Sequence, residues 1–295
     1  MNPLGLHALV WVGDWSPASA EHAISSTAAL GFDLIEVPLL DPATVDAAMT
    51  RSLLEAHGLG AAASLGLDHS ADVSSEDPAV VARGRELLAR AVDVAAEMAA
   101  TDLCGVLYSV LDKYPAPITE RSRQHVVESM AWLSERAAGS GLRVNLEVVN
   151  RYETNVVNTT AEMLDLITET GADLGVHLDT YHMNIEENGM AEAVHQADAA
   201  GRLRYVHVGE SHRGYLGSGN VDFATFFAAV RASAYDGPVV FESFSSAVVH
   251  PTLSNTLAVW RNLWDDSEDL GRHAHEVMAR HLAGDSEPAG AAAGR

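Results

Sequence analysis

Four side chains that could bind a metal or move a proton each close an apolar run in the second half of the chain. They are Glu147 in Asn-Leu-Glu-Val-Val-Asn, Asp179 in His-Leu-Asp-Thr, His207 in Tyr-Val-His-Val-Gly-Glu, and Glu242 in Val-Val-Phe-Glu-Ser. Successive members are 32, 28 and 35 residues apart, which is about the length of one strand and one helix. This spacing predicts that they come from four consecutive strands and meet at the mouth of a parallel barrel.

A divalent cation would explain why three acids end neighbouring apolar strands. Ionised carboxylates are costly to bury without an opposite charge, and three side by side would repel one another. Three carboxylates and one imidazole form an oxygen-rich ligand set that suits Mn²⁺ or Mg²⁺ better than zinc, and Co²⁺ would also be accepted. For any single acid, pairing with a nearby arginine or backbone donor is the simpler alternative. For the four together we predict one metal site, with Mn²⁺ as the favoured ion.

Three further residues in the first two strands leave their roles open. Glu36, in Leu-Ile-Glu-Val-Pro, is a fifth acid at the end of an apolar run. It could contact a substrate or pair with a neighbouring strand. His7 and Trp11 could form part of a pocket wall, but packing in the core is an equal alternative for each.

Eight apolar runs alternate with helical stretches, and their rhythm predicts the fold. The runs cover residues 4–12, 34–37, 59–65, 103–108, 144–149, 174–178, 203–208 and 239–241. Eight strands with intervening helices over about 250 residues are typical of a (β/α)8 TIM barrel. An open doubly wound fold is the alternative, but no Gly-x-Gly-x-x-Gly follows the first run.

The chain boundaries and helix ends refine this prediction. We expect one barrel domain over residues 1–285, with a C-terminal helical extension, and a disordered tail over 286–295, where the composition cannot form a core. Ser16 with Pro17, and Asp77 with Pro78, are predicted helix starts. Gly31, Gly58 and Gly141 are predicted to follow helix ends.

Composition and charge exclude several classes of partner. Lys and Arg number 18 against 41 Asp and Glu, which gives a formal net charge of -23. This sign argues against nucleic-acid and anionic-membrane partners, because both need a basic surface. The single cysteine, Cys104, excludes an intramolecular disulfide. No apolar run is long enough to span a membrane, and the first residues do not resemble a signal peptide, so we expect a cytoplasmic protein.

Longer motifs around the four residues resemble the ketose 3-epimerases, which include the D-tagatose and D-allulose (D-psicose) 3-epimerases. The family belongs to the xylose-isomerase-like barrels. The resemblance rests on residues 146–155, 177–187, 207–214 and 241–244. It extends to Gly-Phe-Asp-Leu-Ile-Glu-Val at 31–37 and Val-Ser-Ser-Glu-Asp-Pro at 73–78, and so covers nearly all of the chain before the tail.

The resemblance implies a role for each matching position. The family's metal ligands fall on the four residues reached from the strand ends, and its two acid/base glutamates fall on Glu147 and Glu242. The groups that hold the ketose oxygens fall on Glu153, His182 and Arg213. Some relatives carry Trp in the loop after the fourth strand, where this chain reads Tyr-Ser-Val-Leu at 108–111. Family resemblance also implies a homodimer or homotetramer.

This assignment predicts interconversion of free ketohexoses, such as D-fructose and D-allulose or D-tagatose and D-sorbose. A metal chelated by O2 and O3 would activate the carbonyl and stabilise the enediolate, while two bases on opposite sides of C3 exchange the proton. An aldose-ketose isomerase of the same fold is the nearest alternative. An apurinic endonuclease is disfavoured by the acidic charge and the single His ligand, and a non-catalytic sugar-binding protein is a third alternative.

Overall fold

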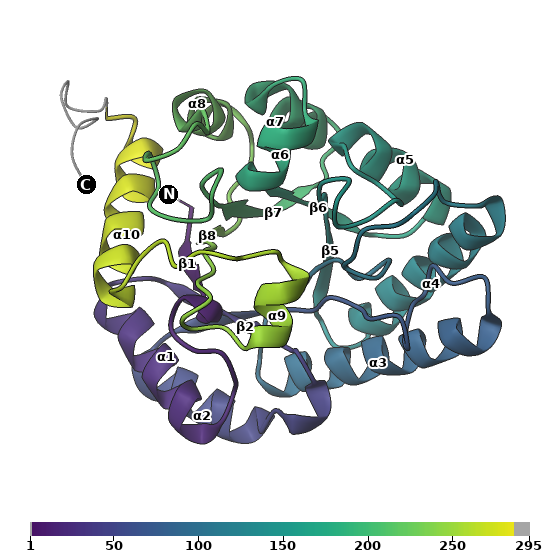
Figure 1. Cartoon of the computed structure of the whole chain (residues 1–295), viewed down its shortest axis with the longest axis horizontal. Helices are drawn as coiled ribbons and strands as arrows, with labels where there is room; N and C mark the ends of the chain where they lie inside the picture. Colours follow the sequence, from purple (N-terminus) through teal and green to yellow (C-terminus); the bar gives the residue numbers. More distant parts are fainter. Residues whose placement is uncertain (1, 286–295) are drawn as a thin grey trace.

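In the computed structural model, which describes residues 2–285, eight parallel strands close into a barrel in chain order (Figure 1). The strands are β1 (Leu4–His7), β2 (Leu34–Pro38), β3 (Gly60–Ser64), β4 (Asp102–Gly105), β5 (Arg143–Glu147), β6 (Gly175–Asp179), β7 (Leu203–Val208) and β8 (Val239–Phe241). Pairing of β1 with β8 closes the ring. The predicted TIM barrel is confirmed.

Helices surround the barrel, and the last one is the predicted C-terminal extension. The helices are α1 (Pro17–Ala29), α2 (Ala47–His57), α3 (Pro78–Glu97), α4 (Glu120–Ala138), α5 (Thr160–Thr170), α6 (Thr180–Glu186), α7 (Met190–Ala199), α8 (Phe223–Ala232), α9 (Pro251–Thr256) and α10 (Ser267–Ala283). Two 3-10 turns, η1 (Ala8–Val10) and η2 (Pro42–Thr44), follow β1 and β2. Figure 1 shows α10 at the edge of the ring, where it packs against α8, β1 and β8.

Capping residues start and stop the helices where the sequence predicts. The Ser16 side chain accepts a hydrogen bond from the Ser19 amide, and Asp77 does the same for Ala79. Each cap is followed by a proline, whose fixed φ suits the first turn of a helix. Gly58 ends α2 with a φ of +65°, a conformation that costs glycine little.

Two predicted strands run three or more residues past the observed strand end, and both errors have the same cause. The run at 4–12 stops being a strand after His7, whose ring accepts from the Leu9 amide and caps the 3-10 turn η1. The run at 103–108 stops at Gly105, which has a φ of +109° and approaches the Leu65 carbonyl so closely that a Cβ would lie 2.5 Å from it. The residues beyond both strand ends are nevertheless buried. Their apolar character therefore reports burial and not extended backbone.

Inside the barrel, side chains follow the two-residue alternation of the strands. A small apolar cluster of Leu34, Ala62, Cys104, Tyr205 and Val240 fills the interior. Two residues after Leu34, Tyr205 and Val240 come Glu36 at β2, His207 at β7 and Glu242 directly after β8. These three residues therefore lie above the apolar cluster, at the carboxyl ends of the strands.

The remaining predictions about the chain concern its end and the membrane. The predicted disordered tail, 286–295, lies outside the described residues. Among residues 2–285, no helix is both long and apolar enough to cross a membrane.

Candidate active site

The four predicted metal ligands meet at the carboxyl ends of β5 to β8, and all are buried. The Nδ1 atom of His207 lies 3.3 Å from Glu242 Oε1 and 3.9 Å from Glu147 Oε1. Asp179, His207 and Glu242 each offer one ligand atom within 4.8 Å of the others. Glu147 forms a similar group with His177 and His207, and another with Asp179 and His182. The structure therefore brings residues distant in sequence into one compact cluster.

Glu36 holds His207 from the side opposite the cluster. Glu36 is fully buried, and its Oε2 atom lies 2.7 Å from His207 Nε2 and accepts a hydrogen bond of 2.8 Å from the Tyr205 hydroxyl. His7 Nε2 lies 3.3 Å from its other oxygen. Although burial opposes ionisation, the positive charges of His207 and His7 hold the pKa of Glu36 well below its usual range. Glu36 thus neither stands alone nor pairs only with a neighbouring strand.

The contact with Glu36 decides which nitrogen His207 presents to the cluster. An ionised carboxylate can only accept, so Nε2 carries a proton. Nδ1 then faces Glu242 and Glu147, and it has no hydrogen-bond partner among the described residues. Burial disfavours the imidazolium, but the charges of Glu36 and Glu242 outweigh it and raise the pKa of His207 to about 10. A cation beside Nδ1 would take the place of that second proton.

Arg213 brings positive charge to the rim of the cluster. Its guanidinium donates to Glu242 Oε2 and lies 3.8 Å from Asp179 Oδ2. The group is stacked on the Tyr181 ring, 3.9 Å from its centroid, with the Phe244 ring at 4.8 Å. Burial works against the charge, yet the surrounding carboxylates raise the pKa of Arg213 above its usual range. The guanidinium is therefore a fixed cation with a defined orientation.

The backbone of Arg213 is as constrained as its side chain. Its φ is +60°, a left-handed conformation that is uncommon outside glycine. The Arg213 carbonyl accepts from the Ser243 hydroxyl at 2.5 Å, and that hydroxyl accepts from Trp264 Nε1 at 2.9 Å. This chain of contacts ties the loop after β7 to the segment after β8.

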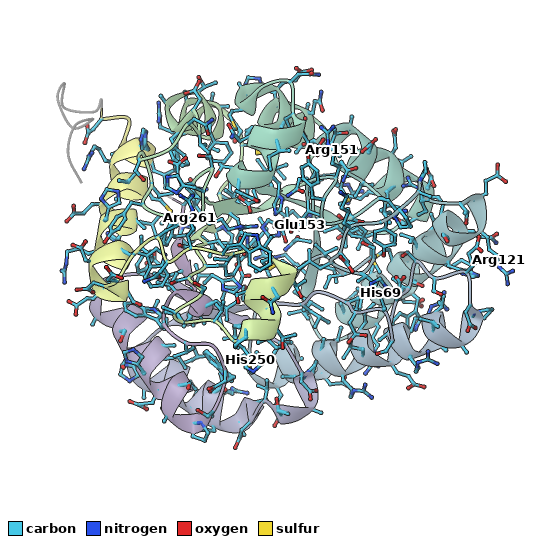
Figure 2. All side chains as sticks on the ribbon, viewed as in Figure 1. His69, Arg121, Arg151, Glu153, His250 and Arg261 are labelled. Carbon is cyan, nitrogen blue, oxygen red and sulfur yellow. The ribbon has the colours of Figure 1, made fainter. Side chains whose placement is uncertain are left out.

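The other two predicted substrate-binding residues, Glu153 and His182, complete the ring around Arg213. Glu153 Oε1 lies 4.0 Å from Arg213 Nη2, and Glu153 Oε2 lies 3.9 Å from His182 Nε2. Glu153 lies near the barrel axis in the view of Figure 2, whereas Arg121 of α4 lies at the outer edge. All seven predicted site residues therefore line one end of the barrel, although their individual roles stay predictions.

Burial makes the carboxylates of Glu147 and Glu242 more basic than carboxylates in water. Although His207 and Arg213 oppose it, burial raises the pKa of Glu242 to about 7. Burial also raises the pKa of Glu147 well above its usual range, with Glu242 and Asp179 adding to the effect. Such groups can accept a proton near neutral pH, as a general base must.

The cluster fits a divalent cation on its own geometry. Asp179 Oδ2, like His207 Nδ1, is a buried atom without a hydrogen-bond partner among the described residues, while Asp179 Oδ1 accepts from the Tyr181 amide at 2.8 Å. Unpaired buried acceptors are costly unless a charge satisfies them. Asp179, His207 and Glu242 offer ligand atoms within 4.8 Å of one another, with Glu147 beside them. Three carboxylates and one imidazole nitrogen are suitable ligands for Mn²⁺, Co²⁺ or Mg²⁺.

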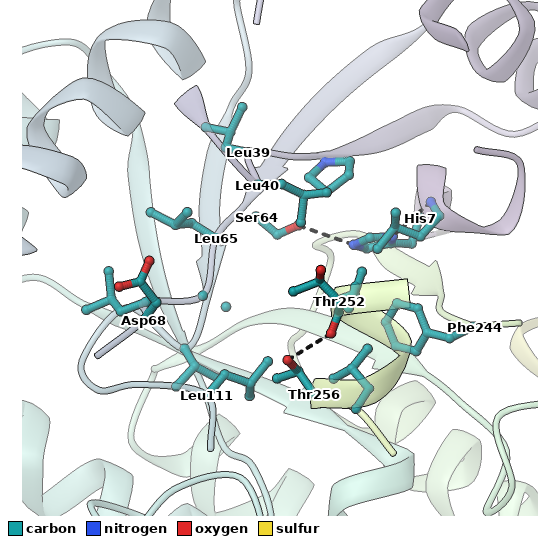
Figure 3. Close-up of a pocket in the computed structure, with 18 of the residues that line it drawn as sticks. His7, Leu39, Leu40, Ser64, Leu65, Asp68, Leu111, Phe244, Thr252 and Thr256 are labelled. Atoms are coloured by element: carbon teal, nitrogen blue, oxygen red, sulfur yellow. Dashed lines mark hydrogen bonds between the residues drawn. The ribbon is translucent and has the colours of Figure 1, made fainter. Parts of the chain in front are cut away.

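A cavity of about 570 Å³ connects this cluster with the surface. Its buried end includes Glu147, His182, His207, Arg213 and Glu242. Its outer part is lined by leucines of several loops and by α9, which lies over the barrel mouth (Figures 1 and 3). Figure 3 shows Leu39, Leu40 and Leu65 across the cavity from Thr252 and Thr256 of α9.

His7 and Trp11, whose roles the sequence left open, lie in different surroundings. His7 lines the cavity, and its Nε2 lies 3.3 Å from the Ser64 hydroxyl (Figure 3). Trp11 packs in the core, where its indole donates to Thr27 on α1 at 2.9 Å. Trp15, which the sequence analysis did not single out, lines the cavity instead.

Comparison with known proteins places this barrel in a family. The family model described as "Xylose isomerase-like TIM barrel" matches residues 24–278. An L-ribulose 3-epimerase of Methylomonas sp. (strain DH-1) is 55% identical over 93% of this chain and 96% of its own. A ketose 3-epimerase of Arthrobacter globiformis is 54% identical over 95% of this chain and 96% of its own.

The chain belongs to the ketose 3-epimerase family. It is therefore a carbohydrate epimerase, and the predicted enzyme class is confirmed. The crystal structure of a Methylomonas sp. D-allulose 3-epimerase in complex with D-allulose matches this epimerase with a TM-score of 0.93 and 54% identity, and the match covers 95% of this chain and 97% of the other.

Sequence reasoning missed several groups around the site of the epimerase. His177 lies on β6 and is buried with its ring centroid 4.1 Å from that of His207, yet the motif containing it was used only for Asp179 and His182. Tyr181 and Phe244 enclose the Arg213 guanidinium. Asn150, within the motif at 146–155, contacts two predicted substrate-binding residues. Each lies inside or beside a quoted motif, so its residue type was visible in the sequence. Most of the contacts that give these residues a role join segments that are far apart in the chain.

Proposed function

We propose that the protein is a metal-dependent ketose 3-epimerase that acts on free ketohexoses, such as D-fructose and D-allulose or D-tagatose and D-sorbose. The observation that carries the proposal is that two buried glutamates, Glu147 on β5 and Glu242 after β8, approach His207 Nδ1 to 3.9 and 3.3 Å from strands that are three positions apart in the barrel. An epimerase needs two such groups, because the proton that leaves one face of C3 must return to the other. The names of the related L-ribulose, ketose and D-allulose 3-epimerases support the same reaction.

In this proposal Glu147, Asp179, His207 and Glu242 hold one divalent cation, with Mn²⁺ favoured. When bound, the ion would supply Lewis-acid activation of the ketose carbonyl and charge stabilisation. Asp179 Oδ2 and His207 Nδ1, which have no hydrogen-bond partner among the described residues, support this ligand set. Glu36 supports it too, because it fixes the His207 ring from behind.

The protein's own residues would then bind the sugar and move the proton. Glu147 and Glu242 act at opposite faces of C3, one removing the proton and the other returning one. The guanidinium of Arg213 donates to ketose oxygens in a fixed direction, because it is stacked between two rings. His182 and Glu153 add a donor and an acceptor. Burial of the cluster excludes bulk water from the carbanion that forms.

The cavity also favours an uncharged sugar over a sugar phosphate. Its outer part is lined by Asp14, Asp41, Asp68 and Asp112. These acids would repel a phosphate group at the far end of the substrate. Arg213 cannot compensate, because it is already paired with Glu242 and Asp179.

A substrate panel tests the proposed reaction. We expect purified protein with Mn²⁺ to convert D-fructose, D-allulose and D-tagatose to their C3 epimers, identified by chromatography. Formation of an aldose instead would identify an aldose-ketose isomerase. Sugar binding with full metal occupancy and no new sugar would identify a binding protein. Either of these results contradicts the proposal.

Metal removal should abolish the activity reversibly. After dialysis against EDTA, we expect the turnover rate to fall at least about a hundredfold, because Lewis-acid activation is worth several kcal/mol. Adding Mn²⁺ or Co²⁺ back should restore it, with the metal content measured in the same samples. Full activity in a protein shown to be metal-free would contradict the proposed role of the ion.

Substitution of Glu36 should weaken metal binding without touching a proposed ligand. We expect Glu36→Gln to lower the affinity for Mn²⁺ about ten- to hundredfold, as is typical when the partner of a metal-binding histidine is lost. Tyr205→Phe is the matched control, because it removes another donor to Glu36 and keeps the contact with His207. Calorimetric titration of the metal-free variants with Mn²⁺ measures both affinities. Equal loss in the two variants would show that Glu36 merely stabilises the barrel interior.

A further inference from the structure

Asn150 links two residues that the sequence predicts to hold the sugar. It lies in the loop between β5 and α5 and is 1% exposed. Its backbone amide donates to His182 Nδ1 at 3.1 Å, and its side-chain nitrogen lies 2.8 Å from the same atom. The side-chain nitrogen also donates to Glu153 Oε1 at 3.0 Å. The side-chain oxygen accepts from the Tyr152 amide at 2.9 Å, which fixes the orientation of the amide group.

These contacts determine the tautomer of His182. A backbone N–H can only donate, so the Nδ1 atom that faces it must be an acceptor without a proton. The neutral ring therefore carries its proton on Nε2. That atom faces the cluster, 3.6 Å from Glu147 Oε1 and from Asp179 Oδ2. Arg213 Nη2, which can only donate, lies 3.4 Å from the same atom, a longer contact than the two donors at Nδ1, so the contacts at Nδ1 decide the tautomer.

The tautomers give the two histidines of the cluster different chemistry. His207 is held at Nε2 by a carboxylate and presents the lone pair of Nδ1, as a metal ligand must. His182 is held at Nδ1 by an N–H group and presents the proton of Nε2, which suits a donor to a sugar oxygen. His182 lies near enough to Glu147 and Asp179 to form a ligand group with them, but a protonated nitrogen cannot ligate a cation.

Asn150 acts on Glu153 as well. One oxygen of Glu153 is engaged by the Asn150 amide, and the other lies 3.9 Å from His182 Nε2. The Glu153 carboxylate is thereby oriented with a free acceptor oxygen beside the donor of His182. A ketose hydroxyl, which both donates and accepts, matches such a pair.

We propose that Asn150 is a positioning residue that fixes His182 as a hydrogen-bond donor and Glu153 as an acceptor toward the substrate. The proposal rests on the proposed function, since it assumes that these two residues bind a ketose. The tautomer itself is a property of the protein without sugar. It can therefore be tested whether or not the protein proves to be an epimerase.

The first experiment measures the tautomer in the unsubstituted protein. The full chain is labelled with ¹⁵N at histidine and loaded with diamagnetic Mg²⁺, and the His182 signals are identified by their loss in a His182→Gln sample. We expect the long-range ¹H–¹⁵N pattern of a ring protonated at Nε2 only. A ring protonated at Nδ1 would overturn the proposal, and this measurement needs no Asn150 variant to fold.

The second experiment compares three substitutions in the same loop. In Asn150→Asp, a carboxylate beside His182 Nδ1 attracts a proton to that atom and repels Glu153. In Asn150→Ala, the side-chain contacts are lost while the backbone donor stays. Asn158→Ala is the matched control, because Asn158 donates to the carbonyls of Val149 and Thr154 and holds the loop without contacting His182 or Glu153.

We expect kcat/KM for D-fructose to fall about ten- to hundredfold in Asn150→Asp, mainly through KM, because charged hydrogen bonds to the sugar are lost. Asn150→Ala should show a smaller loss and Asn158→Ala less than about a threefold change. The affinity for Mn²⁺ should stay within about threefold in all of them. Equal losses in Asn150→Ala and Asn158→Ala, or weakened metal binding in the Asn150 variants alone, would overturn the proposal. No epimerisation by the unsubstituted protein would reject the proposed function and leave the tautomer result standing.

Discussion

Replacing Glu147 or Glu242 with glutamine is expected to stop epimerisation and leave the barrel folded. Each substitution removes one of the two groups that exchange the C3 proton, and general acid-base catalysis contributes about 10²- to 10⁴-fold to a rate. Glutamine keeps the shape of the side chain and an oxygen, so the fold and much of the metal affinity should survive. Chromatographic rate measurements, with metal content and thermal unfolding recorded for each variant, separate loss of chemistry from loss of the ion.

Deuterium exchange makes this prediction sharper. A variant with one remaining base can still remove the C3 hydrogen of the epimer whose hydrogen faces that base, and can return deuterium from D₂O to the same face. Glu147→Gln and Glu242→Gln should therefore each label one epimer of the pair, and they should label opposite ones. Mass spectrometry of the recovered sugars measures this.

A matched control removes an acid outside the site. Glu186 on α6 pairs with Arg151, and Glu186→Gln should retain the activity of the unsubstituted protein. Labelling of both epimers by one of the two site variants would show that a single group serves both faces. Unchanged epimerisation in either of them would disprove its role as a base.

The barrel and the positions of the four proposed metal ligands could be predicted because they depend on local patterns. An apolar run ended by Glu147, Asp179, His207 or Glu242 is visible in the sequence, and the parallel barrel brings the ends of such runs together. Strand ends were less predictable. Residues 8–12 are as apolar as a strand because they are buried, yet their backbone turns after His7.

The partner of Glu36 could not be predicted, since it lies across the barrel. Glu36 on β2 contacts His207 on β7, and 171 residues separate them in the chain. Neither a helical nor a strand period connects such positions. The positions of the two tryptophans after the first strand could not be predicted either. The 3-10 turn η1 changes the direction of the chain, and as a result Trp11 packs on α1 while Trp15 lines the cavity.

Replacing Arg213 with glutamine is expected to impair sugar binding severely without weakening the metal site. The guanidinium is the fixed donor at the buried end of the cavity, and loss of charged hydrogen bonds should lower kcat/KM for D-fructose about 10²- to 10³-fold. Its Nη1 atom lies 3.8 Å from Asp179 Oδ2 and donates to Glu242, so it also competes with a cation for their negative charge. Removing it should leave the affinity for Mn²⁺ unchanged or increase it.

Two companion variants distinguish orientation from charge. Arg213→Lys keeps the positive charge but loses the planar fork and its stacking on Tyr181, so we expect an intermediate loss of kcat/KM. Asp179→Ala removes a proposed ligand altogether and should lower metal affinity instead. Kinetics at saturating Mn²⁺, together with calorimetric metal titration, separate the two effects. Weaker metal binding with an unchanged KM in Arg213→Gln would show that Arg213 stabilises the carboxylate cluster and does not bind the ketose.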